Sequence, residues 1–130
     1  VYIPNKLNIH TILLAGGKGT RMLSKKAKVL QKLAGKSLLE HILCSAEEIS
    51  SKTSIVVGFD KLSVEKEVSK ISTKAKTYEQ KKQIGTADAV RTVIDSINEN
   101  EKVLILYGDV PLISKNTLES LAHSMIQYQY

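Results

Sequence analysis

The chain has 130 residues, of which 42% are hydrophobic and 25% are charged, as in a single soluble globular domain. Its one cysteine, Cys44, excludes an internal disulfide and is typical of a reducing compartment. No apolar run approaches the roughly 20 residues that cross a bilayer, and residues 1–10 lack the apolar segment of a secretory signal. These features argue against secreted, membrane-spanning and disordered proteins, so we expect a cytoplasmic protein without a membrane partner.

The positive charge of the chain is concentrated near its N-terminus. Nineteen Lys and Arg against thirteen Asp and Glu give a net charge of +6. Residues 1–39 hold eight of these bases and no acid, whereas the other 91 residues hold eleven bases and thirteen acids. A local excess of this kind predicts that one segment meets an anionic ligand, and a phosphate-bearing small molecule is the first expectation.

The first half of the chain alternates between strand and helix patterns. Residues 11–15 form a short apolar run that predicts a buried strand, followed by a flexible glycine loop over 16–20. Ser37 and Glu40 have the spacing of a capping box, and apolar residues then recur at helical spacing, which predicts an amphipathic helix over 38–50. A second strand over 54–58 is followed by a helical pattern marked by Val64, Val68 and Ile71.

The second half continues the alternation. A weak strand near 75–79 precedes a loop at 83–86, and a helix is predicted to begin near Thr86. Residues 103–107 form the strongest strand pattern in the chain, which stops at Gly108. The apolar face predicted for the helix that begins near Thr86 consists of Ala87, Val90, Ile94 and Ile97. A last helix is predicted after Pro111, with an apolar face of Leu118, Leu121, Ala122 and Met125.

Strands that alternate with helices predict an α/β fold, with a Rossmann-like, mostly parallel sheet covered by helices on both faces. No repeat, low-complexity tract or linker divides the chain, so residues 1–130 are interpreted as one unit. Ligands of such sheets bind beyond the carboxyl ends of the strands. Polar signals follow two of the predicted strands there, at 16–21 and at 108–109.

The glycines of the first loop suit a phosphate site. Without Cβ atoms, Gly16, Gly17 and Gly19 let the backbone turn and bring its N–H groups against phosphate oxygens. Lys18 and Arg21 would add charge-assisted contacts. Two better-known motifs are excluded, because the third glycine of G-x-G-x-x-G and the first glycine of a Walker A loop are both missing. Met22 and Leu30 occupy those two positions.

Five segments in order carry a family resemblance. They read LAGGKGTRM at 14–22, KVL at 28–30, LAGK at 33–36, QIGT at 83–86 and LYGDVPLI at 106–113. The first resembles the signature of the sugar-phosphate nucleotidylyltransferases. Together the segments resemble the pyrophosphorylase domain of bacterial N-acetylglucosamine-1-phosphate uridylyltransferases, over nearly the whole chain.

The resemblance implies a nucleotide-diphospho-sugar transferase fold and a defined reaction. A phosphate oxygen of N-acetylglucosamine-1-phosphate attacks the α-phosphorus of UTP, giving the cell-wall precursor UDP-N-acetylglucosamine and pyrophosphate. The cofactor implied is Mg²⁺, and full-length members are expected to form homo-oligomers. Such a reaction needs two polyanions aligned and their charge stabilised, which suits a basic segment free of acids.

The family's functional residues carry over to matching positions of this chain. The resemblance implies a backbone bed for the nucleotide at Leu14, Ala15, Gly17 and Gly19. It places Lys18 and Arg21 against the β- and γ-phosphates and Lys28 against the phosphates of the product, with Arg21 and Lys28 as the catalytic residues. It assigns the base pocket to Gln80, Gly85 and Thr86. Tyr107 and Gly108 border the metal segment, in which Asp109 is the expected Mg²⁺ ligand, since Mg²⁺ often needs only one or two carboxylates.

Three positions depart from the family pattern. Gly16 replaces the second alanine that is usual in the uridylyl branch. Relatives that act on other sugar phosphates often have glycine there, so this residue makes N-acetylglucosamine-1-phosphate less specifically indicated as the substrate. Ala27 replaces a proline before Lys28, so the loop of this lysine is expected to be more mobile. Asp88 replaces a common histidine, and its carboxylate would be unfavourable beside the nucleotide but favourable at a helix N-terminus.

The family's catalytic domain continues beyond a segment of this length, so the chain is interpreted as the nucleotide-binding portion of a pyrophosphorylase domain, with a sheet incomplete at the C-terminal side. Three alternatives stay open: a nucleotide-binding or regulatory module without turnover, a transferase for another sugar-1-phosphate, and a small basic nucleic-acid binder. The last is disfavoured because aromatic residues are 5% of the chain and no nucleic-acid motif is present. No nucleic-acid partner is therefore expected.

Overall fold

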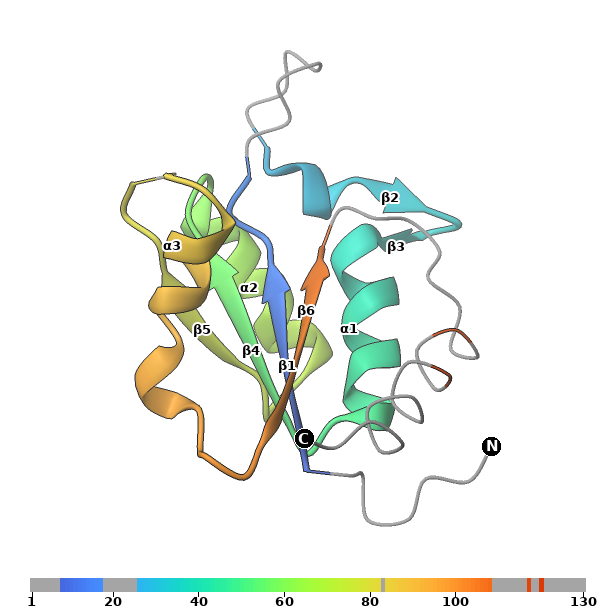
Figure 1. The fold of residues 1–130 in the computed structure, drawn as a ribbon. Helices are drawn as coiled ribbons and strands as arrows, with labels where there is room; N and C mark the ends of the chain where they lie inside the picture. The colour runs from blue at the N-terminus through green and yellow to red at the C-terminus, as the bar shows by residue number, and fades with distance from the viewer. Residues whose placement is uncertain (1–7, 18–25, 83, 109–116, 118–119, 121–130) are drawn as a thin grey trace.

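The core of the molecule is a four-stranded parallel sheet (Figure 1). The computed structural model describes residues 8–17, 26–82, 84–108, 117 and 120. Its strands are β1 (Ile9–Leu14), β4 (Lys52–Val57), β5 (Lys76–Glu79) and β6 (Lys102–Tyr107). They lie in the order β5-β4-β1-β6, and each neighbouring pair is parallel. The strand predictions are thus confirmed, including the weak one near 75–79.

Helices cover both faces of the sheet, which confirms the predicted fold class. Helices α1 (Leu38–Ile49) and α2 (Lys61–Ile71) pack on one face. Helix α3 (Thr86–Arg91) packs on the other face, on the left in Figure 1, and a 3₁₀ turn (Ile94–Ser96) follows it. None of the helices in the described ranges is both long and apolar enough to span a membrane.

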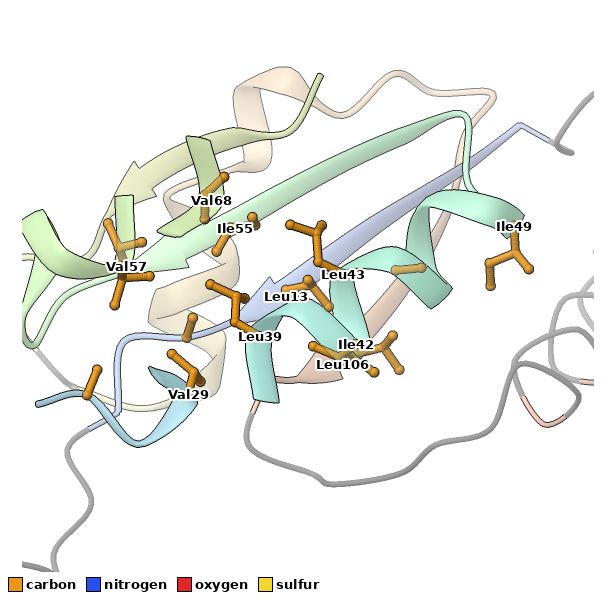
Figure 2. Packing of buried hydrophobic residues seen from close by; sticks show 14 residues of the cluster. Leu13, Val29, Leu39, Ile42, Leu43, Ile49, Ile55, Val57, Val68 and Leu106 are labelled. Carbon is orange, nitrogen blue, oxygen red and sulfur yellow. The ribbon is translucent and has the colours of Figure 1, made fainter. Parts of the chain in front are cut away.

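Alternation along the strands divides the buried residues into two clusters. Leu13 of β1 and Ile55 and Val57 of β4 point toward α1 and α2, where they meet Leu39 and Leu43 of α1 (Figure 2). Their neighbours in sequence, such as Ile12 and Val56, point to the other face and pack against α3. Strands buried on both faces read as continuous apolar runs, which is why 11–15 and 54–58 were recognisable.

Helix α1 begins where the sequence predicts. Ser37 is its N-cap, and the Ser37 Oγ accepts a hydrogen bond from the Glu40 backbone N–H at 3.0 Å. The bond satisfies one of the N–H groups that the first turn of a helix leaves unpaired. All five apolar residues predicted at helical spacing are buried: Leu39, Ile42, Leu43, Ala46 and Ile49.

Helix α3 is shorter than predicted, and the predicted apolar face is right in part, since Val90 and Ile97 are partly buried against the sheet. Ala89 and Val93 are the buried residues, whereas Ala87 is exposed and the Ile94 side chain is 56% exposed. The α-helix ends at Arg91 and a 3₁₀ turn follows, which shifts the phase of later side chains. The hydroxyl of Thr92 donates to the Ala89 carbonyl at 2.7 Å and competes for the backbone groups that a longer helix would use.

The segment between β1 and α1 contains structure that periodicity does not reveal. A 3₁₀ turn (Lys28–Leu30) precedes a two-stranded hairpin, β2 (Lys32–Leu33) and β3 (Lys36–Ser37). Its two loop residues, Ala34 and Gly35, both have positive φ, as in a type I′ turn. This segment lies beside the carboxyl ends of the strands (Figure 1). The helix predicted after Pro111 falls outside the described residues.

A buried polar cluster joins the opposite, amino end of the sheet. The Nε2 of His10 lies 2.6 Å from the Ser54 Oγ, and its Nδ1 lies 2.9 Å from the Glu101 Oε2. The imidazole is fully buried. Burial lowers the pKa of His10 because it penalises the charged form, and Lys52 acts in the same direction, whereas the Glu101 carboxylate opposes them.

This cluster makes stability depend on pH in a definite direction. Because the pKa of His10 in the folded chain lies below its ordinary value of 6.5, the unfolded chain takes up the proton first. The contribution of neutral His10 to stability is therefore complete above pH 6.5 and is lost as the pH falls through the lower pKa of the folded chain. Urea unfolding across this range should show a steeper loss for the unchanged chain than for His10→Gln. The variant His41→Gln, which leaves the cluster intact, is the control, and equal slopes for the chain and His10→Gln would contradict the prediction.

Candidate functional site

A cavity of about 320 Å³ opens at the carboxyl ends of the strands. Leu14 and Gly17 line it from the end of β1 and the loop that follows, and Tyr107 lines it from the end of β6. Lys28 lines it from the 3₁₀ turn. The cavity thus lies at the edge of the sheet where doubly wound folds bind their ligands.

The opposite wall comes from the segment between β5 and α3. Gln80, Gly85 and Thr86 line the cavity, and all three carry the base-pocket prediction. Residues that the sequence did not single out also contribute, namely Val29, Val56 and Ala89. All three are apolar. Their spacing in the sequence does not distinguish a residue that lines a cavity from one that is buried in the core.

Two predicted nucleotide contacts lie beside the cavity wall. Ala15 is buried in the cluster under α1 and α2. Gly108 donates its backbone N–H to the Leu14 carbonyl at 3.0 Å, which fastens the end of β6 to β1. A Cβ on Gly108 would lie 3.1 Å from the Val29 Cγ1, so the absence of a side chain serves close packing there.

Gly16 has a local steric reason that explains the departure from alanine. A Cβ at this position would lie 3.2 Å from the Gly58 backbone nitrogen, which is tighter than side chains normally pack. The Gly16 carbonyl also accepts a hydrogen bond from the Phe59 N–H at 3.2 Å. The loop after β1 therefore rests directly on the backbone of the loop after β4.

Ala27 gains from the absence of proline. Its backbone N–H donates to the Asp60 Oδ2 at 3.2 Å, a bond that a proline cannot make. Ala27 has φ −59° and ψ 142°, which a proline would also adopt. Ala27, which was expected to make the Lys28 loop more mobile, is thus tied to the N-cap residue of α2.

Side-chain hydrogen bonds involve each of the three residues predicted to form a base pocket. The Nε2 of Gln80 donates to the Asp88 Oδ2 at 3.0 Å and to the Gly85 carbonyl at 3.2 Å. Across the cavity, the Thr86 Oγ1 lies 3.0 Å from the Tyr107 Oη, so α3 and the end of β6 are in contact. The Asp88 carboxylate therefore faces Gln80. The sequence led us to expect it either beside the nucleotide or at a helix N-terminus, and neither expectation includes this contact with Gln80.

Four predicted site residues lie outside the described residues: Lys18, Gly19, Arg21 and Asp109. Within the described ranges, no group of three or more His, Cys, Asp or Glu side chains could hold a metal ion. The Mg²⁺ assignment thus depends on Asp109, which directly follows Gly108 in the sequence.

Comparison with known proteins identifies the family. The model of the MobA-like NTP transferase domain matches residues 11–130. The bifunctional protein GlmU of Ruthia magnifica is 44% identical over 120 residues, which are 92% of this chain and 26% of that protein. GlmU of Psychrobacter sp. is 47% identical over 118 residues, 90% of this chain and 26% of the relative. The chain thus spans about a quarter of the length of these relatives.

Solved structures show the same fold at low sequence identity. HddC from Yersinia pseudotuberculosis, in complex with GMP-PN, has a TM-score of 0.75 at 19% identity, covering 91% of this chain and 54% of that one. The 4-diphosphocytidyl-2C-methyl-D-erythritol synthase from Anaerococcus prevotii has a TM-score of 0.71 at 14% identity, covering 92% and 51%. With the family match, the parallel sheet and the cavity at its carboxyl edge, the chain belongs to the MobA-like NTP transferase domain family and is a nucleotidyltransferase domain.

Proposed function

We propose that the chain forms the nucleotide-binding part of a uridylyltransferase that transfers UMP from UTP to N-acetylglucosamine-1-phosphate. The observation that carries the proposal is the cavity at the strand ends, which brings together Lys28, Gln80 and Tyr107 from three distant segments. The GlmU relatives support the substrate assignment, since eight of them are 38–47% identical over about 90% of the chain.

In the proposed reaction, one oxygen of the sugar phosphate forms a bond to the α-phosphorus of UTP. The bond from this phosphorus to the oxygen that bridges it to the β-phosphorus breaks, and that oxygen leaves with pyrophosphate. The transition state spreads negative charge over phosphoryl oxygens, so positioning and cations supply the catalysis. Lys28 lines the cavity, and we assign it to one of these cations, with Lys18 and Arg21 assigned to the β- and γ-phosphates. When bound at Asp109, Mg²⁺ supplies further neutralisation of phosphate charge.

Gln80, Gly85 and Thr86 form the pocket proposed for the uracil ring. Ala89 and Val56 supply apolar surface in the same cavity, and most base and cofactor pockets combine apolar walls with a few polar groups. Full-length proteins that carry this domain are proposed to be cytoplasmic homo-oligomers, in keeping with the single cysteine of the chain.

The test is the release of pyrophosphate from UTP and N-acetylglucosamine-1-phosphate in the presence of Mg²⁺. Release that requires both substrates supports the proposal. Binding of UTP without release favours the second candidate, a nucleotide-binding module without turnover. Release with a different sugar-1-phosphate would change only the acceptor. Strongly salt-dependent binding to duplex DNA without a preference for UTP would contradict both candidates.

Asp109→Asn should remove Mg²⁺-dependent turnover, because an amide replaces the only carboxylate assigned to the ion. The expected loss is on the order of a hundredfold or more in kcat, comparable to other losses of electrostatic stabilisation. Asp95→Asn is the matched control, since Asp95 is exposed on the 3₁₀ turn after α3. The measurement is pyrophosphate release as a function of Mg²⁺ concentration, and an unchanged metal dependence would refute the assignment.

Asp60→Gly should weaken UTP binding by about threefold to tenfold, the usual effect of one lost hydrogen bond. Asp60 is the acceptor that fixes Ala27 beside Lys28, and its φ of 56° suits glycine, so the fold is spared. Asp60→Asn keeps an acceptor oxygen and should bind UTP like the unchanged chain. Calorimetric titration with UTP measures the difference, and equal affinities for all three proteins would show that Asp60 does not position the lysine.

A further inference from the structure

Asp88 lies in the first turn of α3, and its carboxylate is directed at Gln80. The distance from the Gln80 Nε2 to the Asp88 Oδ2 is 3.0 Å. Gln80 lines the cavity, and only 7% of this residue's surface is exposed. The carboxylate therefore contacts the group proposed to read the base, while Asp88 itself does not belong to the described cavity wall.

Gly85 provides a second acceptor on the same side of the Gln80 amide. Its carbonyl oxygen lies 3.2 Å from Nε2. A carbonyl oxygen and an ionised carboxylate accept hydrogen bonds but cannot donate them. With the amide turned round, Oε1 would face both oxygens, so the two acceptors together fix the NH₂ group toward Asp88 and Gly85.

This arrangement leaves one polar atom of the Gln80 side chain for a ligand. Both hydrogens of Nε2 are used, and within the described part of the chain no hydrogen bond to Oε1 is present. Oε1 can only accept. A uracil ring offers a donor at N3–H, whereas cytosine has an acceptor at the same ring position, so the fixed amide favours the first base and repels the second.

We propose that Asp88 is a positioning residue that sets the orientation of the Gln80 amide and thereby the preference for uracil over cytosine. This inference rests on the proposed function, since it takes the cavity to be the base pocket. The effect acts through hydrogen-bond polarity, because the two bases have nearly the same size. A histidine at this position would lack a fixed negative charge. This way of orienting the Gln80 amide is therefore proposed only for chains that carry an aspartate there.

The test compares the affinities of the chain for UTP and CTP by calorimetric titration, before and after Asp88→Ala. Removal of one of two acceptors lets the amide turn, which offers N–H to the ring acceptor of cytosine. UTP should bind more weakly and CTP more tightly, so that the preference for UTP falls by about tenfold, the effect of one charge-assisted hydrogen bond. Asp88→Asn, whose side-chain oxygen can still accept from Nε2, should restore much of the preference.

The outcomes separate this inference from the function on which it rests. Opposite changes for UTP and CTP support the positioning role, because general damage to α3 would weaken both nucleotides together. A preference for UTP that persists unchanged in Asp88→Ala, or that falls equally in Asp88→Asn, overturns the positioning role and leaves the proposed function intact. Failure of the unchanged chain to bind UTP overturns both.

Discussion

Leu43→Ala is expected to lower the free energy of unfolding by about 2–5 kcal/mol, a large part of the roughly 5–15 kcal/mol that holds an ordinary domain folded. Leu43 is fully buried on the face of α1 that meets the sheet, close to Leu13 and Leu39 (Figure 2). Alanine removes the contacts of the leucine side chain and leaves a cavity, because the strands beneath it cannot move inward without losing their hydrogen bonds.

The matched control is Leu62→Ala. This leucine lies on α2 with 80% of its surface exposed, so the same substitution should change stability by no more than about 0.5 kcal/mol. Urea unfolding followed by circular dichroism measures both variants. Equal losses for the buried and the exposed leucine would show that α1 does not pack on the sheet as described.

Gly85→Ala should weaken UTP binding by roughly 5- to 150-fold, which corresponds to about 1–3 kcal/mol of backbone strain. Gly85 has φ 113° and ψ 176°, a region that essentially only glycine adopts. A Cβ there would meet no atom within 4 Å, so the effect comes from the backbone and not from a clash. Relaxation of the strain moves the Gly85 carbonyl away from Gln80 and displaces the start of α3.

Gly35→Ala separates strain from function. Gly35 also has a positive φ, of 82°, and a Cβ on it would likewise meet no atom within 4 Å, but it lies in the β2–β3 hairpin outside the cavity wall. The variant should lose stability and keep its affinity for UTP. Titration with UTP and urea unfolding together give the result, and equal losses of affinity in the two glycine variants would place the effect outside the pocket.

Much of the fold follows from local patterns. The strands at 11–15 and 54–58 are continuous apolar runs because both of their faces are covered, and the Ser37–Glu40 spacing marks the start of α1 through a bond within one turn. The start of helix α3 was predicted correctly, but two residues of its predicted apolar face are exposed because the contacts of Ala89 and Val93 with β1 and β4 decide which residues are buried. Those are tertiary contacts. Because the α-helix gives way to a 3₁₀ turn, the buried residues do not follow a single helical period along this segment.

The candidate site was predictable where a motif carries it. The cavity is lined by seven residues that the family resemblance singled out: Leu14, Gly17, Lys28, Gln80, Gly85, Thr86 and Tyr107. The contacts that hold these residues were not predictable. Asp60 pairs with Ala27 and Asp88 with Gln80, and neither spacing is that of a helix or strand neighbour. Such pairs depend on how the loops meet at the edge of the sheet. Neither helical nor strand periodicity in a single sequence indicates these contacts.

The pairing of Ile9 with Lys102 has a consequence for how the chain folds. Strand β1 lies between β4 and β6, yet β6 is made last of the four. At a ribosomal rate of about 5–20 residues per second, an interval of roughly 5–20 s separates the synthesis of the two partners. During that time one edge of β1 lacks its native neighbour, and closing so long a loop is entropically slow. Among the described strands, β1 therefore gains its second neighbour only after β6 has been synthesised, and until then that edge has unpaired backbone N–H and C=O groups.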